Sequence, residues 1–395
     1  SLLPALKGKK LPERPIYFES LYPYYSRGWA PLKGFILKKK KFIDSPIPEL
    51  YDLNHDFDEL NNLGERDKVT RLTSQLKEII HALTPSEKID AAQQIDRETR
   101  EKLASLGYVS SVRVSQKKDF SVKDDVKVLI PYINKIGEGW KLYKKGKQDA
   151  GIKLLKEIIE ERKDIDLAYK HLASIYQEIG NTEEAIVILE QGFNALPSSY
   201  EIFIEYMKAL ISAQQYDKVI GSFEKMNIRE TECDPEIWNN LGTAYAKKGN
   251  FDKAIKAFEM GLSLDNKYPE LYNNLANACY SHGLQSRDSF IYSRCFEYYK
   301  KAIELDPEYP APYYGLGHAY SQQGNLGGAV YCWEKALEAD PDFSQAHFDL
   351  AVAYLNTGNK TKAFELLGEY KKRYYHLMAP AERERLDALI ERCQK

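Results

Sequence analysis

Residues 235–268 read PEIWNNLGTAYAKKGNFDKAIKAFEMGLSLDNKY, and this stretch sets the pattern for most of the chain. Four residues share one face of a first helix at helical spacing: Trp238, Leu241, Gly242 and Tyr245. After a break at Gly249-Asn250, four more form the apolar face of a second helix: Ala254, Ile255, Phe258 and Gly261. Because Gly242 and Ala254 are small, the two helices can approach closely. The stretch therefore predicts a pair of packed helices.

The same spacing recurs along the chain with a period of 34 residues, and the motif resembles the tetratricopeptide repeat. Units fit this register at 132–165, 166–199, 200–234, 235–268, 269–309, 310–343 and 344–377, the fifth with about seven extra residues near 284–290. Seven units exceed the roughly three that a stacked array needs. The sequence thus predicts a mainly α fold, a right-handed superhelical solenoid of helix-turn-helix repeats. A small α+β N-terminal subdomain with a short antiparallel sheet is expected beside it.

The composition narrows the class of protein. With 395 residues, 29% of them charged, and no apolar run near the roughly 18 residues of a membrane span, the sequence is typical of a soluble protein of two or three domains. A net charge of −2 gives no reason to expect nucleic acid or an anionic membrane as partner. The five cysteines lack metal-ligand or disulfide spacing, so we expect no metal site in this chain. Reduced cysteines favour the cytoplasm. Because the chain begins at Ser1 rather than methionine, it is expected to be a fragment, and the compartment stays open.

The first 112 residues lack the repeat pattern and contain strand-like runs instead. Strand-like runs cover residues 15–19 and 49–53, and a Lys38-Lys39 turn between residues 32–37 and 40–44 predicts a hairpin. Helical patterns follow at about 66–82 and 94–106. The expected domains are a subdomain at 1–112, a linker at 113–130, the repeat solenoid at 131–379 and a capping helix at 380–395.

Residues 1–110 resemble the C-terminal subdomain of the sulfatases, which are alkaline phosphatase-like hydrolases. The resemblance is carried by residues 1–8, by Pro48-Glu49-Leu50-Tyr51-Asp52-Leu53 with Asp56, Glu59 and Asn61-Asn62-Leu63, and by Leu103-Ala104-Ser105-Leu106-Gly107-Tyr108. That family uses a Cys/Ser-x-Pro-x-Arg motif beside a divalent cation, and this sequence lacks the motif. The resemblance therefore implies that the catalytic part lies outside this chain or has been lost. No catalytic residue and no cofactor is expected here, and a cation such as calcium is expected only in that catalytic part.

A polar and aromatic cluster follows the first predicted strand: Glu19, Tyr22, Arg27 and Trp29. On the sulfatase resemblance, this cluster would rim a pocket for an anionic substrate. The alternative is that its aromatic rings close the open side of the sheet. The basic run at residues 38–41 is expected to be a solvated edge that blocks strand addition.

In a repeat array the first helix of each pair lines the concave surface. Counting from each repeat start places a row of candidate peptide-binding residues there: Asn239, Asn240, Asn273, Asn274, Asn277, Tyr280, Tyr314, His318 and Phe348. An amide side chain has both a donor and an acceptor, so an asparagine row can pair with an extended peptide backbone. The alternative is that asparagine is a common filler at these positions.

Two histidines lie within the repeats, and neither is expected to be catalytic. His347 stands where the repeat usually has tryptophan, which predicts a packed side chain, and His318 faces the groove with no carboxylate in matching register. The sequence therefore predicts a protein–protein interaction scaffold that binds a peptide or a partner domain in a concave groove. The alternative is the rear portion of a sulfatase-like hydrolase of sulfate or phosphate esters, whose repeats recruit or regulate it.

Overall fold

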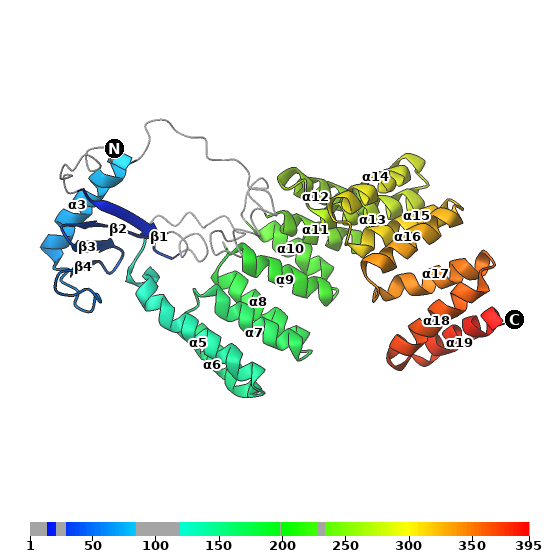
Figure 1. Cartoon of the computed structure of the whole chain (residues 1–395), viewed down its shortest axis with the longest axis horizontal. Coiled ribbons are helices and arrows are strands. Elements are labelled where there is room, and N and C mark those ends of the chain that lie inside the picture. Colours follow the sequence, from blue (N-terminus) through cyan, green and yellow to red (C-terminus); the bar gives the residue numbers. More distant parts are fainter. Residues whose placement is uncertain (1–13, 21–28, 84–118, 198, 227–233, 395) are drawn as a thin grey trace, which may run out of the picture. The chain divides into compact units, whose positions relative to one another are not determined.

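The computed structural model describes residues 14–20, 29–83, 119–197, 199–226 and 234–394. The chain divides into two compact units, unit 1 at residues 1–206 and unit 2 at residues 207–395. Unit 1 holds a small sheet, one helix against it and the first helix pairs, and unit 2 holds the later pairs (Figure 1). The mainly helical solenoid with a short antiparallel sheet is confirmed.

The sheet has four antiparallel strands in chain order: β1 (Ile16–Ser20), β2 (Leu32–Leu37), β3 (Lys40–Asp44) and β4 (Glu49–Asp52). Opposed residues form one apolar row across it: Tyr17, Phe35, Phe42 and Leu50. Leu76 of α3 (Arg66–Leu83) packs against this row. The predicted hairpin is confirmed, because Lys38 and Lys39 adopt positive φ values of 52° and 57°, as a two-residue hairpin turn requires. The helix expected at 94–106 lies outside the described residues.

The first repeat helix begins earlier than the sequence indicated. After the short 3-10 turn η1 (Val122–Asp124), α5 (Val126–Lys144) starts inside the segment expected to be a linker. The carboxylate of its N-cap, Asp125, is fully buried and accepts from the backbone N–H groups of Lys127 and Ile47. Since Ile47 lies between β3 and β4, this one side chain joins the sheet to the first repeat. The 34-residue register placed the first unit at residue 132, but the helix extends six residues further toward the N-terminus and includes Pro131.

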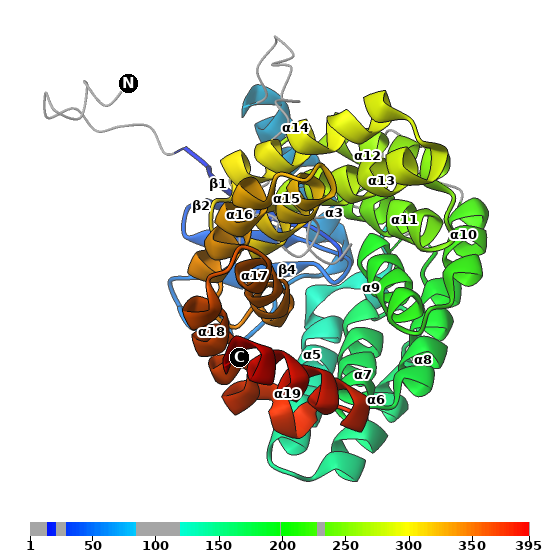
Figure 2. The same cartoon turned by 90° about the vertical axis from the view of Figure 1, so that its right-hand side faces the viewer.

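The repeats are antiparallel helix pairs. Unit 1 contains α5 with α6 (Gln148–Glu161) and α7 (Asp166–Glu178) with α8 (Thr182–Ala195). The third repeat has α9 (Tyr200–Ser212) and α10 (Tyr216–Lys225). Unit 2 then has α11 (Pro235–Lys247) with α12 (Phe251–Leu264), α13 (Pro269–Ser286) with α14 (Ser289–Leu305), α15 (Pro310–Gln322) with α16 (Leu326–Ala339), and α17 (Ser344–Asn356) with α18 (Lys360–Tyr374). After η3 (Tyr375–Leu377), α19 (Pro380–Gln394) packs beside α18 (Figure 2).

The extra residues of the fifth repeat lengthen its helices instead of forming a loop. Helices α13 and α14 have 18 and 17 residues, where α11 and α12 have 13 and 14. Arg287 turns the chain between them in the left-handed conformation, with φ at 56°. This pair is therefore a longer version of the same unit, in the same register as its neighbours.

The two helices of a repeat approach closely where a glycine of the first helix faces an aromatic ring of the second. A Cβ atom on Gly242 would lie 2.5 Å from the ring of Phe258, and one on Gly317 would lie 2.4 Å from Trp333 Nε1. These residues occupy the same two positions of their repeats. The sequence placed Gly242 against Ala254, and the structure shows the Phe258 ring as its close neighbour. His347 is 3% exposed, as predicted for a packed side chain.

Candidate functional site

Two asparagines on neighbouring first helices form the centre of the candidate surface. Asn274 on α13 donates through Nδ2 to Oδ1 of Asn239 on α11 at 2.8 Å. Asn273 Nδ2 lies 3.4 Å from Asn274 Oδ1. Asn239 and Asn274 are half-buried. The bond from Asn274 occupies the acceptor oxygen of Asn239, whereas Asn239 Nδ2 has no partner among the described residues.

Asn240 and Asn273 do not line an open wall, which corrects the prediction for these two residues. Their side chains are 7% and 5% exposed. Asn273 Nδ2 also faces the hydroxyl of Tyr309 at 3.4 Å. Within the described part of the chain, Asn240 Nδ2 and Asn273 Oδ1 have no hydrogen-bond partner. Adjacent asparagines in one helix point in directions about 100° apart, so only one of each pair can face outward.

Asn277 repeats the pattern of Asn239. Its side chain is exposed, and its Oδ1 accepts from the hydroxyl of the buried Tyr299 at 2.5 Å. Its Nδ2 has no partner among the residues described. Asn239 on α11 and Asn277 on α13 therefore offer N–H donors, while their oxygens are bonded internally. Tyr280, one turn further along α13, is half-buried with its ring 5.7 Å from that of Tyr292.

His318 belongs to a bonded cluster, which corrects the expectation that it stands alone. Its Nε2 lies 3.2 Å from Oδ2 of Asp349, and the Tyr314 hydroxyl donates to the same oxygen at 2.7 Å. Burial raises the pKa of Asp349, but the hydrogen bonds from His318 and Tyr314 outweigh it and hold the pKa below its usual value. Burial and the bond to Asp349 raise the pKa of Tyr314. The cluster joins α15 to α17 and fixes the imidazole ring on the first-helix surface.

A cavity of about 360 Å³ lies next to this cluster, where α17, α18, η3 and α19 meet. It is lined by Ser344, Phe348, Tyr370, Tyr374, Leu377, Met378, Glu382, Arg385 and Leu386. The guanidinium of Arg385 lies over the ring of Phe348, 5.0 Å from its centroid. The sequence assigned Phe348 to the binding surface, but it did not indicate Arg385, because α19 was expected only to cap the array.

The predicted substrate-pocket rim in unit 1 is only partly described. Glu19 is exposed and accepts from the Tyr17 hydroxyl at 2.7 Å, and Trp29 is half-buried. Tyr22 and Arg27 lie outside the described residues. The rim therefore stays a prediction.

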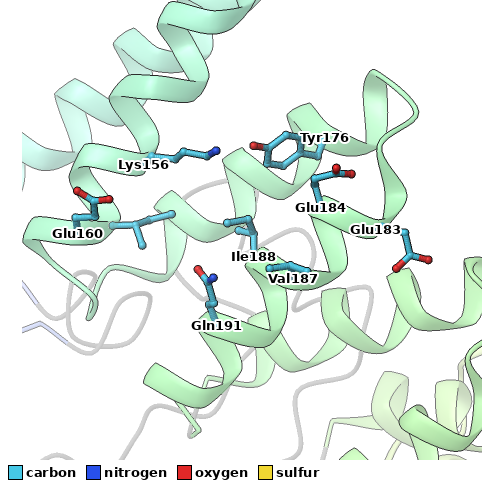
Figure 3. Close-up of a pocket in the computed structure, with 9 residues that line it drawn as sticks. Lys156, Glu160, Tyr176, Glu183, Glu184, Val187, Ile188 and Gln191 are labelled. Carbon is cyan, nitrogen blue, oxygen red and sulfur yellow. The ribbon is translucent and has the colours of Figure 1, made fainter.

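A second concavity lies in unit 1, between the second helices α6 and α8 (Figure 3). Its volume is about 410 Å³, and its apolar lining comes from Ile159, Tyr176, Val187 and Ile188. Glu160, Glu183 and Glu184 line it too, and Lys156 Nζ lies 5.7 Å from the Tyr176 ring centroid. Most of its lining comes from second helices of unit 1, whereas the predicted binding residues belong to first helices.

Among the described residues, no three or more His, Cys, Asp or Glu side chains gather in a way that could hold a metal ion. Within the same part of the chain, no helix combines the length and apolarity needed to cross a bilayer.

Comparison with known families places repeats along much of the array. Models described as "Tetratricopeptide repeat" match residues 168–195, 235–268 and 345–374, and one described as "TPR repeat" matches residues 297–324 and 317–358. The matches coincide with α7–α8, α11–α12 and the helices from α14 to α18.

Several known proteins are similar to parts of this chain. Human protein O-mannosyl-transferase TMTC1 is 27% identical over 146 residues, which cover 37% of this chain and 16% of that protein. A tetratricopeptide repeat protein from Parabacteroides merdae has a TM-score of 0.50 at 17% identity, covering 67% of this chain and 99% of that one. The Cut9–Hcn1 structure of the APC/C has a TM-score of 0.50 at 15% identity, covering 85% of this chain and 61% of that one. The chain spans about a sixth of the length of that human relative, and its helix pairs are an array of tetratricopeptide repeats.

Proposed function

We propose that the first-helix surface of unit 2 binds an extended segment of a partner protein. The surface is defined by six side chains on α11, α13, α15 and α17: Asn239, Asn274, Asn277, Tyr314, His318 and Phe348. The repeat array supports a protein-interaction scaffold, because stacked helix pairs present a continuous surface along the row of first helices.

The observation that carries the proposal is the polarity of the amide row. Asn239 and Asn277 have their oxygens occupied, by Asn274 Nδ2 and the Tyr299 hydroxyl, and their Nδ2 groups are left to donate. An extended peptide has an unpaired carbonyl at every residue, and a fixed donor can bind it without reading the side chain. The surface thus binds the carbonyl groups of the partner backbone through its own N–H donors. The sequence had predicted that the asparagines would act as both donors and acceptors.

The test is the affinity of a captured partner for paired variants. A partner isolated by pull-down from the source cell is titrated against the double variant Asn239→Ala/Asn277→Ala. Two lost hydrogen bonds should weaken binding by about 1–3 kcal/mol, or at least roughly fivefold in Kd. Asn266→Ala is the matched control, because this exposed amide lies in the turn before α13. Unchanged affinity in a folded double variant would reject the amide row.

Binding through these uncharged amides should also depend little on salt, because screening acts on charges. A titration of the same partner at about 0.1 M and 1 M salt separates this contribution from charged contacts elsewhere on the surface. A large loss of affinity in the double variant at both salt concentrations is expected. A loss seen only at low salt would contradict the assignment of the binding energy to the amides.

As a second candidate, we propose from the resemblance of residues 1–110 to sulfatases that this chain is the rear portion of a longer hydrolase. Each family match given above falls within residues 168–374, so none of them bears on this segment. On that proposal the repeats would recruit or regulate a hydrolase whose catalytic residues, and any divalent cation, lie outside this sequence. No described side chain favours it over the scaffold.

A further inference from the structure

We propose that the cavity between α17, α18, η3 and α19, called here the end pocket, binds a large apolar side chain of the partner segment, while Arg385 binds an acidic side chain two residues away. The inference rests on the proposed function and adds the chemistry of the partner. It assigns a recognition role to α19 in addition to its place at the end of the array.

The end pocket has the size and lining of a side-chain site. Its volume of about 360 Å³ falls in the roughly 300–1,000 Å³ range of ligand sites. Aromatic rings supply much of its wall, with Tyr370 and Tyr374 at 4.9 Å from each other and Phe348 beneath Arg385. Leu377 stands on its edge with 74% of its surface exposed. Filling such a pocket with an aliphatic or aromatic side chain removes apolar surface from water on both partners.

Arg385 is the charge that selects the neighbour of that side chain. Its side chain is exposed and its guanidinium lies over the Phe348 ring. No described carboxylate forms an ion pair with it, although its charge contributes to the lowered pKa of Asp349. The two nearby carboxylates have other partners. Asp349 accepts from Tyr314 and His318, and Glu382 accepts from the backbone N–H of Ala379 at 2.9 Å. The guanidinium thus keeps its donors for an external carboxylate, which it can bind with charge-assisted hydrogen bonds.

The spacing between the apolar and the acidic side chain of the partner follows from the extended backbone that the amide row would bind. In an extended chain, residues i and i+2 point to the same side, roughly 6.5–7 Å apart. Arg385 lies 5.0 Å from the ring centroid of Phe348, on the lining of the same pocket. A partner residue in the pocket therefore brings the residue two positions away to Arg385. The recognised pattern is apolar-x-acidic, or the reverse order.

Short peptides test this directly on the full chain. Acetyl-Gly-Ser-Leu-Ser-Glu-Ser-Gly-amide and acetyl-Gly-Ser-Glu-Ser-Leu-Ser-Gly-amide are titrated into protein labelled with nitrogen-15, with the arginine Nε–Hε resonances followed. We expect at least one order to shift the Arg385 resonance. Replacing Glu by Gln in that peptide should weaken binding about tenfold, and replacing Leu by Ala should abolish it at the same concentrations.

Two variants complete the design. Arg385→Gln should lower the affinity of the protein for the Glu peptide to its affinity for the Gln peptide. Arg392→Gln removes the same charge from an exposed residue of the same helix and should leave the affinity for the Glu peptide unchanged. Equal affinities for the Glu and Gln peptides, or no shift at Arg385 with either order, would overturn the proposal. So would tighter binding of acetyl-Gly-Ser-Leu with a free carboxylate, which would identify a chain terminus as the ligand. Because the peptides need no captured partner, these results are separate from the test of Asn239 and Asn277.

Discussion

At the scale of single residues, the turn inside each helix pair depends on one left-handed position. Glycine occupies it at φ values of 75–82° in five places: Gly146, Gly180, Gly249, Gly324 and Gly358. In the third and fifth repeats the same position holds Gln214, at φ 59°, and Arg287, at φ 56°. A residue with a Cβ atom pays about 1–2 kcal/mol to adopt this conformation. The two irregular repeats thus carry backbone strain that the regular ones lack.

Relieving that strain should stabilise the protein. Gln214 is exposed, so replacing it removes no buried contact. We expect Gln214→Gly to raise the free energy of unfolding by about 1 kcal/mol, measured by urea denaturation. Gln323→Gly serves as the control, because Gln323 has an ordinary φ of −81° and glycine there only gains unfolded-state entropy. Equal effects of the two substitutions would show that the left-handed backbone at Gln214 carries no strain.

The hydrogen bonds from His318 and Tyr314 to Asp349 should make the free energy of unfolding depend on pH in the acidic range. The pKa of Asp349 is lowered in the folded state, so its carboxylate stabilises the fold above its unfolded pKa of roughly 3.9, and this contribution is lost as pH falls through the folded value. We expect the free energy of unfolding of Asp349→Asn to fall less steeply than that of the unaltered protein between about pH 5 and pH 2. Glu365→Gln, which removes an exposed carboxylate of α18, controls for net charge. Parallel pH curves for Asp349→Asn and the unaltered protein would contradict the bonding seen here.

At the scale of elements, the helix pairs could be predicted because their signals are local. Glycine turns, small residues at the contact and a 34-residue period all fall within one unit of sequence. The contacts that shape the candidate site are not local. Asp349 lies 31 residues after His318, and Arg385 lies 37 residues after Phe348, in an element outside the repeat register. The inward turn of Asn240 and Asn273 was missed for another reason, because a repeat position gives a helix face only to within about one residue.

Helix α19 should contribute to the stability of the protein as well as to the end pocket. Leu386 is fully buried in the cluster that α19 forms with α17 and α18. We expect Leu386→Ala to lower the free energy of unfolding by about 2–5 kcal/mol, seen as a lower denaturation midpoint. Glu384→Ala, on the exposed side of the same helix, should change it little. A similar midpoint for both variants would mean that α19 is not docked as described.

At the scale of the whole molecule, the sequence lacks the nucleophile motif of the family that residues 1–110 resemble. The sequence has no Cys/Ser-x-Pro-x-Arg motif, and Cys233-Asp234-Pro235-Glu236 comes nearest but lacks the arginine. We therefore expect the chain alone to hydrolyse neither aryl sulfates nor phosphate mono- or diesters, with or without an added divalent cation. The assay uses chromogenic esters and repurified protein. Turnover that follows the protein through repurification would contradict this expectation and favour a hydrolase that acts with the residues of this chain.

In a repeat array, a destabilising substitution should affect mainly the neighbouring helix pairs, because each pair contacts mainly its neighbours. A leucine at position 242 would overlap the Phe258 ring, which already leaves no room for a Cβ atom. We expect Gly242→Leu to cost about 1–3 kcal/mol and to lower the melting temperature. In native-state hydrogen exchange, amide protection should fall most in α11–α14 and least in α17–α19, since those last helices pack mainly against α16 and one another. Gly368→Leu, at an exposed position of α18 with open space around it, is the control for added apolar volume. Uniform loss of protection across unit 2 would show that its repeats unfold as one cooperative block, and an unchanged melting temperature would show that the Gly242–Phe258 contact is misplaced.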